Sequence, residues 1–150
     1  MTLSWYFAYG SNMNPARMAA RGMQYVESAP AELSGWRLRF NKRAEGRKGV
    51  AFANIVEAPG EQVEGVLYRL ARPAEIRRMD PYEGYPQRYT RIPMDVRAGE
   101  VFRRAWVYVA NTDWQQEGLT PERVYLNHLL AGRPWLSESY FRRLLQTRCC

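Results

Sequence analysis

A short polar loop between an apolar segment and a predicted helix is the first place in the chain with the residues for chemistry. Residues 10–12 are Gly-Ser-Asn, and Pro15 then suits the first turn of a helix capped by Asn12 or Asn14. Free backbone amides at such a helix start attract anions and developing negative charge. An isolated tripeptide of this kind is usually only a turn and a cap, so both interpretations stay open.

Two carboxylates three residues apart form a second candidate, in a segment that contains Asp80 and Glu83. Such a segment is normally a solvated turn, because glutamates are seldom buried. A glutamate with an ordinary pKa of about 4.3 is a weak base. Burial against Tyr82, Tyr85 or Tyr89 would raise the pKa of Glu83 and make it a better acid or base.

Residue types that support other chemistries are scarce. The single histidine, His128, lies in a predicted helix, where a surface or core role is more common than catalysis. Cys149 and Cys150 are adjacent, and neighbouring cysteines rarely bridge without strain. No cluster has the spacing of a metal site or suggests a Ser-His-acid triad. We therefore expect no metal site and no redox chemistry.

Length and composition predict one domain over residues 1–150. The chain is 46% hydrophobic and 13% aromatic, enough to bury a core and offset the lost conformational entropy. No run approaches the ~18 apolar residues of a membrane span, and the first residues lack the features of a secretion signal. We expect a cytoplasmic protein with no membrane partner.

The net charge of +7 permits attraction to nucleic acid, to membranes or to anionic small molecules. The 22 basic residues are spread along the chain, so charge alone selects no partner. Arg88 and Arg91 follow the candidate carboxylate closely in the sequence. They are either ordinary solvated strand residues or contacts for a substrate that carries carboxylates.

The elements that must position these residues follow from hydrophobic periodicity and turn signals. Strands are predicted over residues 5–9, 33–40, 50–56, 63–70, 88–96 and 101–110. Residues 41–49 are predicted to be an exposed connection, residues 58–60 a turn, and Gly65 a point of close backbone approach. About six strands with helices inserted singly favour an α+β fold whose sheet is curled or closed.

Helices are predicted near residues 15–21, from Pro73 to Asp80, from Thr120 to Gly132, and from Ser137 onward. The second should end at the Asp80-Pro81 step, because proline disfavours helical geometry in the residue before it. Residues 80–86 would then form a loop that carries Glu83.

Several short motifs follow one another in a particular order along nearly the whole chain. They are residues 6–13 (Tyr-Phe-Ala-Tyr-Gly-Ser-Asn-Met), 65–68 (Gly-Val-Leu-Tyr) and 80–84 (Asp-Pro-Tyr-Glu-Gly), followed by Tyr89, Pro121, Tyr125, Gly132, Leu136 and Tyr140. This order resembles the γ-glutamylcyclotransferase-like family, also called AIG2-like. An ordered set is far more specific than one short string. Met13 and Met79 stand where the family commonly has leucine, and both changes conserve volume.

The resemblance implies a small mixed β-barrel with flanking helices, and an enzyme that converts a γ-glutamyl amide into 5-oxoproline and a free amine without a cofactor. The substrate's own α-amino group attacks its γ-carbonyl. Glu83 occupies the family's catalytic carboxylate position, which implies the role of general acid and base.

The resemblance also implies substrate-binding residues beside a cavity. These are Tyr9, Gly10, Ser11, Asn12, Met13, Tyr89 and Tyr125. For Tyr89 and Tyr125, core packing explains an aromatic side chain about as well as ligand contact.

Other functions remain open at this stage. The amine that leaves can belong to an amino acid, a free amine or a modified side chain, and the oligomeric state is undetermined. A glutathione-specific enzyme of the related ChaC group is disfavoured, because that group carries Leu where this chain has Asn12. The alternatives to an enzyme are a binding module with a ligand pocket or a basic surface for nucleic acid, and an interaction protein in which Glu83 only supports the loop.

Overall fold

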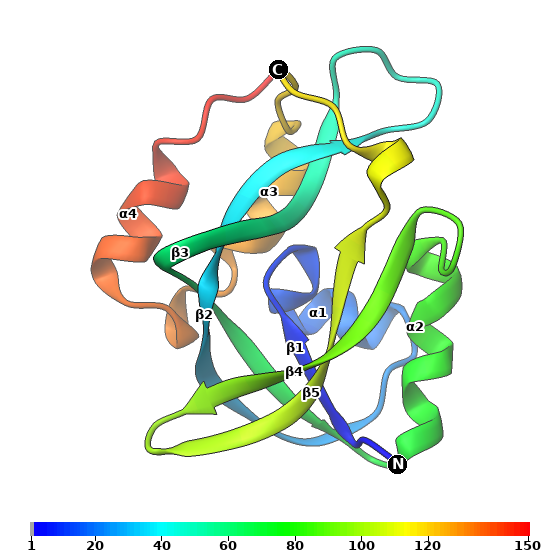
Figure 1. The fold of residues 1–150 in the computed structure, drawn as a ribbon, viewed down its shortest axis with the longest axis vertical. Coiled ribbons are helices and arrows are strands. Elements are labelled where there is room, and N and C mark those ends of the chain that lie inside the picture. Colours follow the sequence, from blue (N-terminus) through cyan, green and yellow to red (C-terminus); the bar gives the residue numbers. More distant parts are fainter. Residues whose placement is uncertain (1) are drawn as a thin grey trace.

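Five strands close into a barrel in the computed structural model, which describes residues 2–150. The strands are β1 (Trp5–Ala8), β2 (Tyr25–Arg43), β3 (Ala51–Leu70), β4 (Tyr89–Ala98) and β5 (Val101–Ala110). Their order is β1-β3-β2-β4-β5, and a parallel pairing of Tyr6 with Trp106 joins β5 back to β1. The other neighbours are antiparallel, as Figure 1 shows. The predicted α+β fold with a closed sheet is confirmed.

The predicted turn at residues 58–60 lies inside one long strand, and this correction accounts for five strands in place of about six. Residues 50–56 and 63–70 belong almost entirely to β3, which pairs with β2 along most of its length. The pairing shifts register between Ser34 and Trp36, so the two strands bend together and continue. β2 also continues to Arg43, which places Asn41 and Lys42 in a strand and buries them.

Four α-helices lie outside the barrel: α1 (Pro15–Ala20), α2 (Ile76–Glu83), α3 (Arg123–Leu130) and α4 (Glu138–Leu145). Asn14 is the cap of α1, because its Oδ1 accepts a hydrogen bond of 3.0 Å from the Ala16 amide. Ser137 caps α4 in the same way. In Figure 1, α2 and α4 lie on opposite sides of the barrel.

Helix α2 does not end at the Asp80-Pro81 step as predicted, but runs through Pro81 to Glu83. The side chain of Asp80 accepts hydrogen bonds from Arg91 and Tyr108, and these contacts hold it in the helix. Gly84 then ends the helix in the left-handed conformation, with φ of 67°. Glu83 is therefore the last helical residue, with its position set by the helix.

The core fills the barrel and extends beneath the helices. Phe7, Ile55 and Tyr68 are buried inside it, and Leu126 and Leu129 attach α3. A Cβ atom on Gly65 would lie 2.3 Å from the carbonyl oxygen of Ala8, so the close backbone approach predicted at this glycine is present. Within residues 2–150, every helix is too short or too polar to cross a membrane.

Candidate active site

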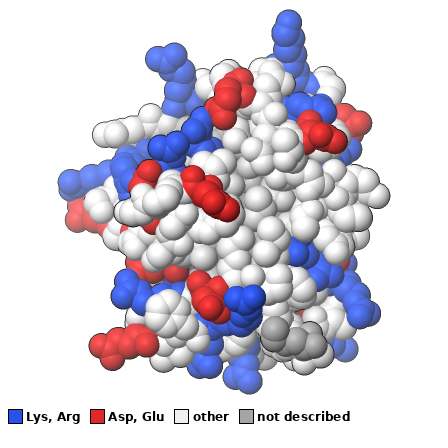
Figure 2. Space-filling view, in the orientation of Figure 1, with Lys and Arg blue, Asp and Glu red and all other residues white. Residues whose placement is uncertain are grey.

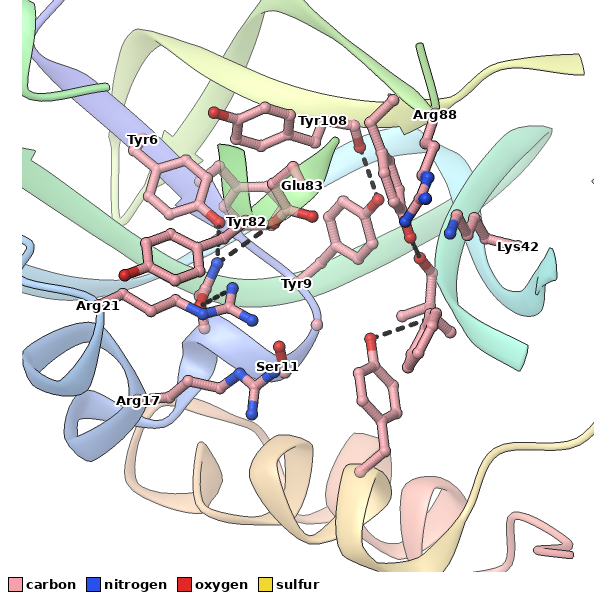
Figure 3. A pocket seen from close by; sticks show the side chains of 17 residues that line it. Tyr6, Tyr9, Ser11, Arg17, Arg21, Lys42, Tyr82, Glu83, Arg88 and Tyr108 are labelled. Carbon is pink, nitrogen blue, oxygen red and sulfur yellow. Dashed lines mark hydrogen bonds between the residues drawn. The ribbon is translucent and has the colours of Figure 1, made fainter. Parts of the chain in front are cut away.

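A cavity of about 240 Å³ opens where β1 leaves the barrel. Figure 3 shows the side chains around it. It is lined by Tyr6, Phe7, Tyr9, Gly10, Ser11, Asn12, Arg17, Arg21, Lys42, Phe52, Ala53, Tyr82, Glu83, Arg88, Tyr89, Tyr108 and Tyr125. Seven of the eight predicted site residues, all except Met13, are therefore brought to one place.

The loop after β1 forms one wall of the cavity, and Asn12 is its central side chain. Asn12 is buried, and its Nδ2 donates to the Tyr6 hydroxyl at 2.8 Å. The same nitrogen lies 3.3 Å from Oε1 of Glu83. Arg21 donates to Oδ1 of Asn12 at 3.1 Å. Asn12 thus joins the first strand, the first helix and the Glu83 carboxylate.

The backbone of this loop also has donors to offer. The amides of Ser11 and Asn12 make no hydrogen bond within residues 2–150, whereas the amide of Met13 donates to the Gly10 carbonyl at 3.0 Å. The Met13 side chain is fully buried and packs where a Cβ on Gly132 would lie 2.9 Å from it. Met13 therefore packs in the core, which differs from the cavity contact that the resemblance implied.

Glu83 is the last residue of α2, and its side chain lines the cavity. The residue as a whole is partly buried. Desolvation by burial is the largest influence and raises the pKa of Glu83. The cations Arg21, Arg17 and Lys42 oppose this rise, and the charge of Asp80 adds to it. The net rise has the direction expected from the sequence, and it makes the carboxylate a stronger base than an exposed glutamate.

A network behind Glu83 fixes the end of α2. Arg91 donates to Oδ1 and Oδ2 of Asp80 at 2.9 and 3.1 Å, and the Tyr108 hydroxyl donates to Oδ1 at 2.6 Å. Arg91 also stacks on Trp106, with its guanidinium carbon 4.4 Å from a ring centroid. Arg91 therefore supports the helix end from outside the cavity, whereas Arg88 lines the cavity.

Tyr89 and Tyr125 are anchored on the backbone of one residue of β3. The Tyr89 hydroxyl donates to the Ala53 carbonyl at 2.7 Å, and the Ala53 amide donates to the Tyr125 hydroxyl at 3.0 Å. Burial raises the pKa of Tyr125 to about 12, so this hydroxyl keeps its proton near neutral pH. Both rings pack against the barrel and face the cavity.

Four cationic side chains line the cavity. For Arg88 the sequence left contact with an acidic substrate open, whereas Arg17, Arg21 and Lys42 were not predicted. Arg17 lies in α1 and Arg21 is the residue that ends this helix, Lys42 comes from β2, and Arg88 comes from the segment before β4. Arg17 and Arg21 are four residues apart on the helix that follows the loop, a spacing that puts both on one face and could have indicated them. The polar sequence around Lys42 gave no sign that it is buried.

Other reactive groups lie apart from the cavity. Nδ1 and Nε2 of His128 lie 3.0 Å from Asn14 and Arg17 respectively, and the ring does not line the cavity. Cys149 and Cys150 are free. Across the part of the chain that the structure describes, no three His, Cys, Asp or Glu side chains are grouped to hold a metal ion.

Solved structures share this fold. A gamma-glutamyl cyclotransferase superposes with a TM-score of 0.82 at 21% identity, over 100% of this chain and 90% of the other. The protein YkqA from Bacillus subtilis superposes with a TM-score of 0.83 at 24% identity, over 97% of this chain and 55% of the other. At these identities the likeness concerns the fold alone.

Sequence comparison adds the family. A gamma-glutamylcyclotransferase from Mus musculus is 35% identical over 83 residues, which is 53% of this chain and 43% of that protein. The match thus spans less than half of the mouse protein. The family model described as gamma-glutamyl cyclotransferase, AIG2-like, matches residues 6–129. The chain therefore belongs to the AIG2-like gamma-glutamyl cyclotransferase family.

Proposed function

We propose that this protein is an enzyme that cyclises a γ-glutamyl amide to 5-oxoproline and a free amine, with Glu83 as its general acid and base. One observation carries the proposal: a carboxylate with a raised pKa faces a cavity, beside the loop that follows the first strand. Membership of the family supports the reaction class.

Both reacting groups lie on one molecule, so the cavity has to fold the glutamyl chain until the α-amino nitrogen approaches the γ-carbonyl carbon. Holding reactants in this way can raise their effective concentration to about 10⁵ M or more. The cavity of about 240 Å³ has room for a small folded substrate, and its walls come from strands and helix ends. These elements would preorganise the reaction.

The proton balance requires one group that works in both directions. Glu83 accepts a proton from the α-ammonium, and the free amine then attacks the γ-carbonyl carbon. A tetrahedral intermediate forms. Glu83 returns the proton to the leaving nitrogen, and the old carbon–nitrogen bond breaks. The attacking nitrogen loses its second proton by the same route through Glu83, so 5-oxoproline is released together with the amine in its ammonium form. No water is consumed.

Negative charge develops on the carbonyl oxygen as the intermediate forms, and donors that are already in place stabilise it. The amides of Ser11 and Asn12 are free for this task or for holding the substrate α-carboxylate. Arg17 and Arg21 add positive charge on the same side of the cavity, as Figure 3 shows. We also propose that the substrate contacts four further residues of the cavity lining: Tyr9, Gly10, Tyr89 and Tyr125.

A binding module without catalysis is the alternative. On the face shown in Figure 2, basic side chains are interspersed with acidic ones, and this face offers no continuous basic stripe for nucleic acid. A small-molecule γ-glutamyl partner fits the cavity better. The cytoplasmic location and the single domain over residues 1–150 stay predictions of the sequence.

The proposal is tested by measuring 5-oxoproline release from γ-glutamyl amino acids, γ-glutamyl amines and γ-glutamyl side chains. We expect release from at least one class by the wild-type protein. We also expect the Glu83→Gln variant to bind the same compound and to lose about 10²–10⁴-fold in kcat, the range of general acid–base catalysis. Binding of the compounds without any release would favour the binding module.

A further inference from the structure

Lys42 is a buried cation that the proposed chemistry does not use. It lies on β2 with only 3% of its surface exposed, and it lines the cavity. It forms no ion pair with any residue that the structure describes. Lysine is almost never fully buried without a partner, so this position calls for an explanation.

Three aromatic rings hold the ammonium group in place. Nζ lies 4.8 Å from a ring centroid of Trp114, 5.2 Å from that of Phe52 and 5.7 Å from that of Tyr89. Ring faces attract a cation but do not neutralise its charge. Desolvation and the nearby Arg88 lower the pKa of Lys42 to about 8, so it is still mostly charged at neutral pH. A bound anion would relieve this unfavourable burial.

The cations lie at two ends of the cavity, with the proposed acid and base between them. In Figure 3, Arg17 and Arg21 are on one side, Lys42 and Arg88 are on the other, and Glu83 lies between the two groups. Arg88 is paired with the exposed Glu45. Among the described lining residues, Glu83 is the one carboxylate that faces these four cations. This charge distribution suits a ligand with an anionic group at each end.

A γ-glutamyl α-amino acid has this charge pattern. It carries the glutamyl α-carboxylate on one side of the reacting atoms and the carboxylate of the leaving amino acid on the other. A γ-glutamyl amine has only the first of these groups. A γ-glutamyl group on the side-chain nitrogen of a protein also lacks a carboxylate next to the leaving nitrogen.

We infer that Lys42 binds the carboxylate of the leaving amino acid and makes γ-glutamyl α-amino acids the preferred substrates. This inference rests on the proposed function. The glutamyl α-carboxylate then occupies the opposite end, near Arg17 and the free amides of Ser11 and Asn12. Lys42 acts as a specificity-determining residue and takes no part in proton transfer.

Two substrates that differ in one group test the inference: γ-glutamyl-alanine and γ-glutamyl-ethylamine, which lacks only the alanine carboxylate. The variant Lys42→Met keeps an unbranched apolar chain among the three rings, and Lys48→Met changes an exposed lysine as the matched control. Lys42→Gln is a second variant in case Lys42→Met does not fold. The measurement is kcat and KM for 5-oxoproline release by each protein.

We expect the wild-type protein and Lys48→Met to prefer γ-glutamyl-alanine by about tenfold or more in kcat/KM, the scale of a charge-assisted hydrogen bond. Lys42→Met should remove this preference by raising KM for γ-glutamyl-alanine. Because Lys42 also lowers the pKa of Glu83, the substrates are compared on the pH plateau of each protein, where the change for γ-glutamyl-ethylamine should be much smaller. Equal losses for both substrates would overturn the inference, because Lys42 would then act on the glutamyl part that they share. A wild-type protein without the preference would overturn it as well.

Failure of the proposed function has a different signature. If the wild-type protein releases no 5-oxoproline from either compound, the reaction is wrong, and calorimetric titration of both compounds then tests the carboxylate site alone. Tighter binding of γ-glutamyl-alanine that disappears in Lys42→Met would support the site. Equal affinities for the two compounds would overturn it.

Discussion

The side-chain amide of Asn12 faces the carboxylate of Glu83, with Nδ2 of Asn12 lying 3.3 Å from Oε1 of Glu83. The two residues are 71 positions apart in the sequence. The barrel brings them together because β1 ends at the cavity and α2 ends beside it. The proposed substrate-binding loop and the proposed acid/base thus lie side by side at the cavity, and this arrangement determines several measurable properties.

The first prediction concerns stability and pH. Burial raises the pKa of Glu83, so the folded state favours its neutral form, and the stabilisation relative to the charged form is lost as pH rises through the folded-state pKa. We expect Glu83→Gln to have a higher Tm than the wild-type protein at neutral pH. The difference should vanish below the ordinary glutamate pKa of about 4.3. A lower Tm for the variant at neutral pH would show that the charged form is favoured in the folded protein.

A second prediction concerns the pH dependence of the proposed activity. Arg21 is the cation that lowers the pKa of Glu83 most, so Arg21→Gln should raise this pKa. The acid limb of kcat/KM reports the free-enzyme pKa of the essential base, and it should move to higher pH in the variant. Arg77→Gln, an exposed position on α2, is the control and should leave the limb in place. A shift to lower pH would contradict the assignment.

A third prediction concerns the network that holds the end of α2. Asp80→Asn weakens the paired contact with Arg91 and should lower the free energy of unfolding by about 1–3 kcal/mol. Because the charge of Asp80 raises the pKa of Glu83, the acid limb of kcat/KM should also move to lower pH.

The control for this network is Asp95→Asn, which weakens an exposed ion pair with Arg104 on the hairpin formed by β4 and β5. It should change stability by about 0.5 kcal/mol or less, as is usual for surface pairs. If Asp80→Asn is destabilised and its acid limb does not move, Asp80 affects the fold without tuning Glu83.

A fourth prediction concerns the contact between β1 and β3. Gly65→Ala would place a Cβ atom 2.3 Å from the Ala8 carbonyl oxygen, just before the site loop. We expect chemical denaturation to show a loss of about 1–3 kcal/mol, the range for overpacked cores. The control Gln62→Ala, exposed on the same strand, should stay within about 0.5 kcal/mol. Equal stabilities would mean that the two strands can separate without loss.

The sequence predicts the parts of the site that depend on local motifs. The loop at residues 10–12 follows an apolar strand and precedes a proline, and these signals are local. Glu83 could be selected only through the order of motifs along the chain, because its own segment is typical of a solvated turn. The position of Glu83 depends on contacts of Asp80, in the same helix, with Arg91 of β4 and Tyr108 of β5.

The parts that the sequence does not predict depend on distant pairing. Lys42 is buried because β2 continues along β3 and because Trp114, far along the chain, covers it. The turn signal at residues 58–60 marks an irregular bend inside β3: residues 58–61 have no partner in β2, and Gly60 adopts φ of 85°. Pairing with β2 resumes on both sides of this bend, so the two halves form one strand. Met13 points into the core because the short turn that contains it directs its side chain toward Gly132. Periodicity within a segment carries none of this information.

Single-turnover release of 5-oxoproline from a γ-glutamyl amino acid, compared between wild-type protein and Glu83→Gln, tests proton transfer by Glu83 most directly. We predict that the variant binds the compound with similar affinity and that its release rate falls by about 10²–10⁴-fold. A variant that binds the compound and releases 5-oxoproline at the wild-type rate would contradict the role of this carboxylate.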